Sequence, residues 1–177
     1  MPNKMKIGLL SDTHGWLDPA VFTYFSSCDE IWHAGDIGTL EVIQQLADFK
    51  PIKAVYGNID GKEIRAIYPE NQFFTCEGLD VWITHIGGRP PRYNPKVLEH
   101  FKQHTPDLFV CGHSHILQVM HDKLHPPVLY LNPGAAGRYG FHQVRTLLRF
   151  EIHEFTISHM QAIELGPRSH PTINHGT

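Results

Sequence analysis

The stretch Lys6-Ile7-Gly8-Leu9-Leu10-Ser11-Asp12-Thr13-His14 sets the pattern for the whole chain. Its first half, Lys6–Leu10, is a short apolar run typical of a buried strand. The run is too short to be a signal peptide or to cross a membrane. Its second half places a carboxylate and an imidazole directly after the strand. Similar pairs of an apolar run and a polar cluster return further along the chain.

Strand-like and helix-like segments alternate through the first third of the sequence. Glu30–Ala34 and Ile52–Tyr56 have the apolar character of buried strands. Asp18-Pro19 combines a helix N-cap with proline at the first helical position, and Gly38–Phe49 has apolar residues at helical spacing. This order predicts parallel strands joined by right-handed crossovers.

The remaining two thirds of the chain contain more strands and one further helix. Glu77-Gly78 is a turn signal between two strand-like runs, and Asn94-Pro95 repeats the helix-start signature. The expected strands are Gln72–Cys76, Leu79–Ile83 and Leu108–Cys111, followed by four antiparallel strands at Leu117–Leu124, Val128–Leu131, Thr146–Ile152 and Phe155–Ile163. These elements predict a single α/β domain over residues 1–165, with helices outside a mixed or doubled sheet, and a polar tail over residues 166–177.

Composition narrows the classes of partner and compartment. A chain of 177 residues fits one compact domain, and its net charge of −3 with scattered Lys and Arg argues against binding of duplex nucleic acid. Cys28, Cys76 and Cys111 show no CxxC spacing, so we expect reduced, packed thiols in a cytoplasmic protein without a membrane span. The sequence leaves open whether the chain forms a homo-oligomer.

Five polar clusters stand at or just past the carboxyl ends of predicted strands. Ligands in open α/β sheets bind outside these ends, so neighbouring strands would bring the clusters into one crevice. Each cluster alone is an ordinary turn sequence, but the ordered set is improbable by chance. The clusters are Asp12-Thr13-His14, Gly35-Asp36, Gly57-Asn58, His85 and Gly112-His113-Ser114-His115.

The side chains of these clusters are ligands for divalent metals. Two carboxylates, one amide oxygen and four imidazoles are too many for one tetrahedral zinc and suit two metals that share a bridging group. The set contains no thiolate, which favours manganese, iron, nickel or zinc, with manganese as our first expectation. Gly35, Gly57 and Gly112 each precede a candidate ligand, where we expect the chain to turn sharply off a strand.

With these motifs in place, the sequence resembles the calcineurin-like metallophosphoesterases over residues 6 to about 150. The family order is DxH, GD, GN, a histidine and GHxH, and all five parts are present here. The short chain resembles the small branch, which holds compact phosphodiesterases and a retromer subunit that works as a scaffold. The resemblance implies a four-layer α/β/β/α sandwich of two mixed β-sheets flanked by helices. It also implies that Asn132-Pro133-Gly134 is a family turn, which we interpret as structural.

The resemblance also implies how the ligands divide between two metals. Asp12, His14, Asp36 and His115 would hold one ion, and Asp36, Asn58, His85 and His113 would hold the other, with Asp36 bridging. His113 and His115 are two positions apart and would face the same side of a strand. Because they are assigned to different ions, we expect Gly112–His115 to form a turn.

The expected reaction is hydrolysis of small phosphodiesters, and of monoesters second, by a hydroxide that bridges the metals. Asp36, Asn58 and His85 are the residues that we assign to catalysis. Two alternatives stay open: a catalytically weak scaffold of the same fold, and a hydrolase of carbon esters or amides. Ile59 stands where calcineurin-type phosphatases have a proton-donating histidine, so the sequence shows no evident general acid.

Several polar residues have roles that the sequence does not assign. His33 is interpreted either as a residue that orients a ligand or as a buried core histidine, and Asp60 either as a partner of His14 or His85 or as a surface turn residue. Arg89, Arg92 and Arg138 either bind a substrate phosphate or are solvated. The histidines outside the motifs are interpreted as surface or packing residues: His121, His125, His142, His153, His159, His170 and His175.

Overall fold

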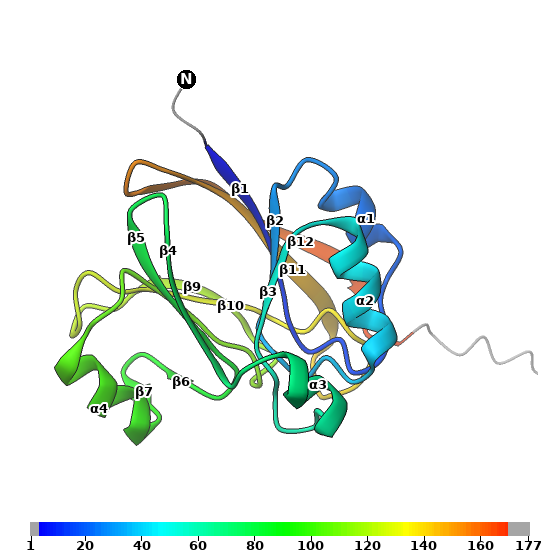
Figure 1. Cartoon of the computed structure of the whole chain (residues 1–177), viewed down its shortest axis with the longest axis horizontal. Helices are drawn as coiled ribbons and strands as arrows, with labels where there is room; N and C mark the ends of the chain where they lie inside the picture. The colour runs from blue at the N-terminus through cyan, green and yellow to red at the C-terminus, as the bar shows by residue number, and fades with distance from the viewer. Residues whose placement is uncertain (1–3, 170–177) are drawn as a thin grey trace, which may run out of the picture.

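Two five-stranded sheets dominate the computed structural model, which describes residues 4–169 (Figure 1). The first sheet has the order β12-β11-β1-β2-β3, with bounds Thr156–Pro167, Val144–His153, Met5–Leu10, Glu30–His33 and Ile52–Ala54. The second has the order β4-β5-β8-β10-β9, with bounds Asn71–Cys76, Leu79–Thr84, Leu108–Val110, Leu129–Pro133 and Leu117–His121. A small hairpin of β6 (Gly88–Arg89) and β7 (Arg92–Tyr93) lies outside both sheets.

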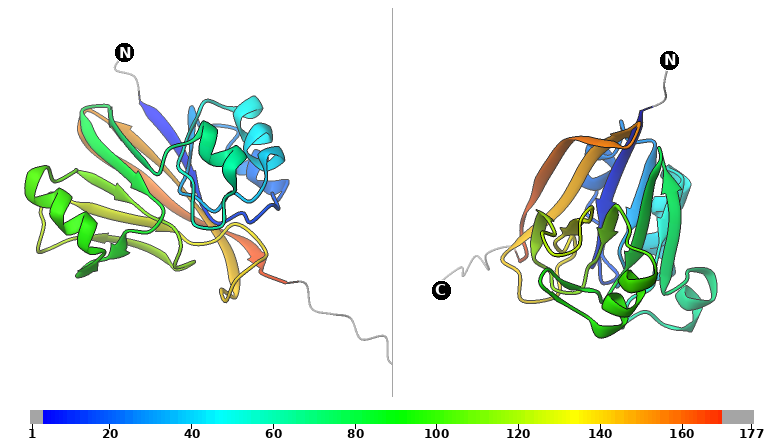
Figure 2. Two further views of the ribbon diagram at one scale, coloured as in Figure 1. Left: turned by 60° about the horizontal axis from the view of Figure 1, so that its bottom comes forward. Right: turned by 90° about the vertical axis from the view of Figure 1, so that its left-hand side faces the viewer.

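Three apolar clusters fill the spaces between the layers of the molecule. The central cluster joins the two sheets, with Ile7 and Trp32 from the first and Ile83 and Val110 from the second. The second cluster packs α1 (Ala20–Tyr24), α2 (Leu40–Phe49) and α3 (Lys62–Ile67) against the first sheet. The third packs α4 (Pro95–Gln103) against the second sheet. Figure 2 shows the two sheets between these helices, which confirms the four-layer α/β/β/α sandwich.

Strand β1 shows how the alternation of side chains builds these layers. Ile7 and Leu9 point into the core between the sheets, and Leu10 points to the helices on the other face. Gly8 also faces the helices, where a Cβ would lie 2.6 Å from the Phe25 ring. The lack of a side chain at this position therefore lets helix α1 pack directly on the strand.

The pairing of the strands confirms the parallel crossovers expected for the first third of the chain. Strands β1, β2 and β3 are parallel neighbours, and β11 and β12 complete the sheet in antiparallel pairing. In the second sheet β5, β8 and β10 are parallel. Strand β10 is antiparallel to β9 but parallel to β8. The prediction that Val128–Leu131 is an antiparallel strand is therefore wrong for its pairing with β8.

Other boundaries differ from the sequence-based expectations. Helix α1 begins at Ala20, one residue later than expected, and Pro19 is its N-cap while the Asp18 side chain accepts a hydrogen bond from the Ala20 amide. Helix α3 and the β6–β7 hairpin were not predicted. Strand β12 continues to Pro167, two residues into the segment expected to be a tail. Residues 170–177, which include His170 and His175, lie outside the described part of the chain.

Two further expectations concern the cysteines and membrane insertion. Cys28, Cys76 and Cys111 are all buried and free, and burial raises the pKa of each thiol. This agrees with packed, unreactive thiols. Within residues 4–169, no helix has the length and apolar character needed to span a bilayer.

Candidate metal centre

All five polar clusters meet where the parallel strands of the two sheets end. In the first sheet, Asp12 follows β1, Asp36 follows β2 and Asn58 follows β3. In the second, His85 follows β5 and His113 follows β8. A hydrogen bond joins the two sheets here, since the His113 amide donates to the side-chain oxygen Oδ2 of Asp12 at 3.1 Å. The convergence expected from the strand order is therefore present.

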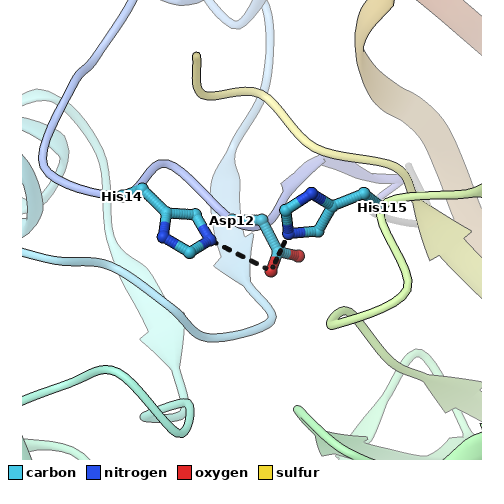
Figure 3. Close-up of side chains that lie close together, drawn as sticks. All are labelled: Asp12, His14 and His115. Carbon is cyan, nitrogen blue, oxygen red and sulfur yellow. Dashed lines mark ion pairs between the residues drawn. The ribbon is translucent and has the colours of Figure 1, made fainter. Parts of the chain in front are cut away.

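The acidic and imidazole ligands gather in two groups of three, in which potential ligand atoms lie within 4.8 Å of one another. The first group is Asp12, His14 and His115, and Figure 3 shows both imidazoles directed at one oxygen of the carboxylate. In it, Asp12 Oδ1 is 3.0 Å from His115 Nε2 and 3.8 Å from His14 Nε2. The second group is Asp36, His85 and His113. This division matches the assignment of ligands to two ions made from the resemblance.

One oxygen of Asp36 faces both groups. Its Oδ2 is 3.5 Å from His14 Nε2 in the first group and 3.2 Å from His85 Nε2 in the second. The other oxygen, Oδ1, accepts a hydrogen bond from the Ile59 amide at 3.1 Å, which fixes the orientation of the carboxylate. Asp36 therefore adjoins both ligand groups.

Three buried polar atoms in this centre have no hydrogen-bond partner: Asp12 Oδ1, His14 Nε2 and His85 Nε2. Leaving a buried polar atom unpaired is costly, so such atoms call for a ligand. His85 Nδ1 donates to the Ala34 carbonyl at 2.7 Å, which leaves Nε2 with a free lone pair directed at Asp36. A divalent cation would satisfy all three atoms, so the residues fit the metals that the family pattern implies.

Hydrogen bonds also prepare His115 as a ligand, through a residue that the sequence analysis assigned to the surface. His142 Nε2 donates to the Gly137 carbonyl at 2.9 Å, and His142 Nδ1 accepts from His115 Nδ1 at 3.2 Å. Burial lowers the pKa of His142, which favours the neutral form that this chain of bonds needs. His115 Nε2 is thereby left to face Asp12. The interpretation of His142 as a surface or packing residue was wrong.

The carboxylates of the centre are held in their charged form. Burial alone would raise the pKa of Asp12, but the imidazoles of His115 and His14 beside its carboxylate hold it well below its usual value. The pKa of Asp36 is also lowered, because the adjacent His85 imidazole outweighs the burial that opposes ionisation. Bound cations would replace the protons of these contacts, so both side chains are ready to bind metal at neutral pH.

Five of the seven candidate ligands have a left-handed backbone. The φ angles are 55° at Asp12, 46° at His14, 53° at Asp36, 68° at His113 and 58° at His115. Such angles are unfavourable for residues with a side chain and cluster at functional sites. Successive turns of this kind at His113 and His115 break the extended chain, so Gly112–His115 forms the expected turn.

Two of the three glycines before ligands serve a different purpose from the one expected. Gly35 has a φ of +97°, which fits the sharp turn that the sequence suggested. Gly57 and Gly112 have no such angle. A Cβ at Gly57 would lie 2.0 Å from Asp36 Oδ1, and one at Gly112 would lie 2.2 Å from Ser11 Oγ. These two glycines allow neighbouring ligand loops to pack against each other.

The family sequence model for the calcineurin-like phosphoesterase superfamily domain matches residues 5–154 of this chain. This chain belongs to that superfamily. A probable metallophosphoesterase of Methanothermobacter thermautotrophicus is 31% identical over 137 residues, which cover 74% of this chain and 77% of the relative.

Solved structures of this superfamily's fold show the same architecture. A structure described as a novel archaeal phosphodiesterase is 25% identical, with a TM-score of 0.71, and the match covers 91% of this chain and 100% of the other. Vps29 of Entamoeba histolytica, solved in complex with zinc, is 16% identical with a TM-score of 0.67 over 93% of this chain and 100% of that one. The second likeness shows the fold alone.

In this member of the phosphoesterase superfamily, Asp60 joins two of the ligand loops. It is buried, and its carboxylate accepts hydrogen bonds from the amides of Ile37, Gly38 and Gly57 at 3.1, 2.8 and 2.7 Å. Both sequence-based interpretations of Asp60 were wrong, because it contacts neither His14 nor His85 and is not at the surface. It ties the loop of Asp36 to the loop of Asn58.

His33 is a fully buried residue that also supports the ligand loops. Its Nδ1 accepts from the Gly35 amide at 3.1 Å, and its Nε2 donates to Thr13 Oγ1 at 3.0 Å. Burial lowers the pKa of His33 to about 4, so the ring is neutral at pH 7. The interpretation of His33 as a hydrogen-bonded buried histidine is therefore correct, and its bonds link the loop before Asp36 to the loop between Asp12 and His14. A role in orienting a ligand stays a prediction.

Of the remaining candidate residues, some lie beside the ligand groups and others do not. Asn58 is exposed and lines two cavities beside the histidine groups, in one of which it lies together with Asp36 and His113. Asn132 donates to the Gly112 carbonyl at 3.0 Å and so supports the turn of His113. Arg138 lies over the Trp16 ring at 3.7 Å. Arg89 and Arg92 are exposed in the β6–β7 hairpin and line neither cavity.

Proposed function

We propose that this chain hydrolyses small phosphodiesters with the help of two divalent cations, manganese being the first candidate. The observation that carries the proposal is the pair of ligand groups that share Asp36, with three buried and unpaired atoms directed between them. Asp12, His14, Asp36 and His115 would hold one cation. Asp36, Asn58, His85 and His113 would hold the other.

Charge explains why this arrangement suits a phosphate ester. Bound divalent cations supply Lewis-acid polarisation of the phosphoryl group and activate water as a nucleophile. Asp12 and Asp36 contribute two negative charges, and Asn58 offers a neutral oxygen. The site with two divalent cations is therefore net positive, which attracts and stabilises the anionic ester. His85, held by the Ala34 carbonyl, keeps its free nitrogen directed at Asp36.

The test is an assay of manganese-loaded protein on three chromogenic substrates. Bis(p-nitrophenyl) phosphate should be hydrolysed faster than p-nitrophenyl phosphate, and p-nitrophenyl acetate should be hydrolysed no faster than by manganese in buffer. Asp36→Asn removes the charge shared by both groups and should lower diesterase activity by about 100-fold or more. Asp48→Asn, an exposed position on α2, is the matched control and should keep full activity.

The same assay distinguishes the alternative functions. Preferential cleavage of the acetate would favour a hydrolase of carbon esters. Full metal loading without hydrolysis of either phosphate ester would favour a scaffold. The scaffold has one structural argument, because four exposed apolar side chains border the cavity next to the His115 group: Ile59, Ile116, Tyr139 and Phe141.

A further inference from the structure

A second cavity adjoins the ligands on the opposite side from His115. This cavity, the His85-side pocket, has a volume of about 480 Å³ and begins at His85 and Asn58. It extends away from the centre to β4 and α4, and α4 lies with α3 on the lower side of the molecule in Figure 1. Its size is within the range of about 300–1,000 Å³ that small-molecule sites have.

Three aromatic rings form one wall of the pocket, at the end that lies against β4 and α4. Phe73 stacks on Trp82 with ring centroids 5.1 Å apart and an interplanar angle of 27°. His100 of α4 lies 4.8 Å from Phe73 and 4.5 Å from Trp82. Phe73 is nonetheless 52% exposed, whereas Trp82 is 5% exposed. A large ring that is held by two others and still exposed is suited to stack with a planar ligand group.

Apart from Ile86 and Val97, most of the remaining lining residues are polar, with more positive than negative charge. Arg65 and Lys96 are its cations and Glu70 is its only carboxylate. Asn71 accepts from the Trp82 indole at 2.9 Å through Oδ1, a bond that does not use its Nδ2 donors. The pocket therefore combines an aromatic wall, groups that can bond the edge of a polar ring, and a charge that favours an anionic ester.

We propose that the His85-side pocket binds a planar, polar ring carried by one ester group of the substrate, a nucleobase being the closest chemical match, and that Phe73 is its specificity-determining residue. The proposal rests on the proposed function, because it places the phosphate at the ligands beside His85. A phosphodiester has a group on each side of its phosphorus. The pocket would take one of them, while the separate cavity of about 470 Å³ beside His115 is available to the other.

The test compares two phosphate monoesters that differ only in the base. Adenosine 5′-monophosphate and ribose 5-phosphate are titrated into the manganese-loaded protein by calorimetry and are also tested as competitive inhibitors of bis(p-nitrophenyl) phosphate hydrolysis. Stacking of one base on an aromatic side chain is typically worth a factor of about ten or more in affinity. Adenosine 5′-monophosphate should therefore bind at least about tenfold more tightly than ribose 5-phosphate.

Variants of two exposed phenylalanines make the test specific. Phe73→Ala should reduce the affinity for adenosine 5′-monophosphate by about tenfold and leave that for ribose 5-phosphate unchanged. Phe155→Ala, which removes a 71% exposed ring outside the pocket, should change neither affinity.

Equal binding of the two monoesters by the wild-type protein, or equal behaviour of the two variants, would overturn the proposal. If hydrolysis of the diester continues in that case, the proposed function stands without this pocket. If the wild-type protein hydrolyses no diester, the proposed function fails and the assignment of the pocket fails with it.

Discussion

His142 shows how a single residue outside every motif completes a ligand. It lies 27 positions from His115 and reaches it only because the loop after β10 passes over the metal centre. The two bonds of His142 place the proton of His115 on Nδ1, so that Nε2 is the nitrogen available to a metal. Nothing in the local sequence distinguishes this histidine from the exposed His121, which explains why sequence reasoning missed it.

We expect His142→Ala to weaken manganese binding by about 10- to 100-fold, because His115 loses the bond that fixes its tautomer. The affinity is measured by competition with a chelating dye. His142→Gln keeps an acceptor and a donor and should restore part of the loss, while His121→Ala should have no effect. Equal affinities for His142→Ala and wild type would show that the bond to His115 does not matter for metal binding.

Asp60 acts on two elements, the segments that follow β2 and β3. Its carboxylate accepts three backbone amides, and its own carbonyl accepts from Arg65 Nε at 2.6 Å, which ties in helix α3. The ligands Asp36 and Asn58 stand in these segments. Their relative position therefore depends on a residue that is not itself a candidate ligand and whose carboxylate bonds only backbone amides.

Asp60→Asn should destabilise the metal-free protein by about 3 kcal/mol, because an amide cannot accept all three bonds and leaves a buried N–H group unpaired. The free energy of unfolding is measured with urea in the presence of a chelator. Asp48→Asn makes the same chemical change at an exposed position and should be within about 0.5 kcal/mol of wild type. A similar small effect for both variants would remove Asp60 from this role.

The elements that precede ligands were predictable, and the small ones between them were not. Strands β1, β2, β5 and β8 have apolar runs that the sequence shows clearly, and the polar residues after them define the centre. Helix α3 has six residues and one buried side chain, Ile64, so its periodicity is weak. Strands β6 and β7 have two residues each and exist only through their pairing with each other.

At the scale of the whole molecule, the meeting of the two sheets brings the candidate ligands together, and we infer that no residue of the described range 4–169 serves the centre as a proton donor. His33 is not placed to donate a proton to a leaving group, because it is fully buried with both ring nitrogens bonded. Ile59, which is 46% exposed, occupies the position of the family's proton-donating histidine. We therefore expect departure of the leaving group to depend on its own ability to leave as an anion.

We expect kcat/KM to fall steeply as the pKa of the leaving group rises in a series of substituted aryl phosphodiesters. A general acid typically contributes about 10²- to 10⁴-fold, and its absence affects poor leaving groups most. Tyr139, whose ring lies 5.2 Å from that of His14, is tested in the same series as Tyr139→Phe. A slope near zero in the wild-type protein would mean that a proton donor operates in this site.

The measurement that tests the central claim most directly is anomalous diffraction from crystals of the manganese-loaded protein, recorded at the manganese absorption edge. Two peaks should appear, one beside Asp12, His14 and His115 and the other beside His85 and His113, with Asp36 in contact with both. In Asp36→Asn crystals grown under the same conditions, at least one peak should be lost. A single peak in the wild-type protein, or one ion bound by both His113 and His115, would contradict the two-metal site.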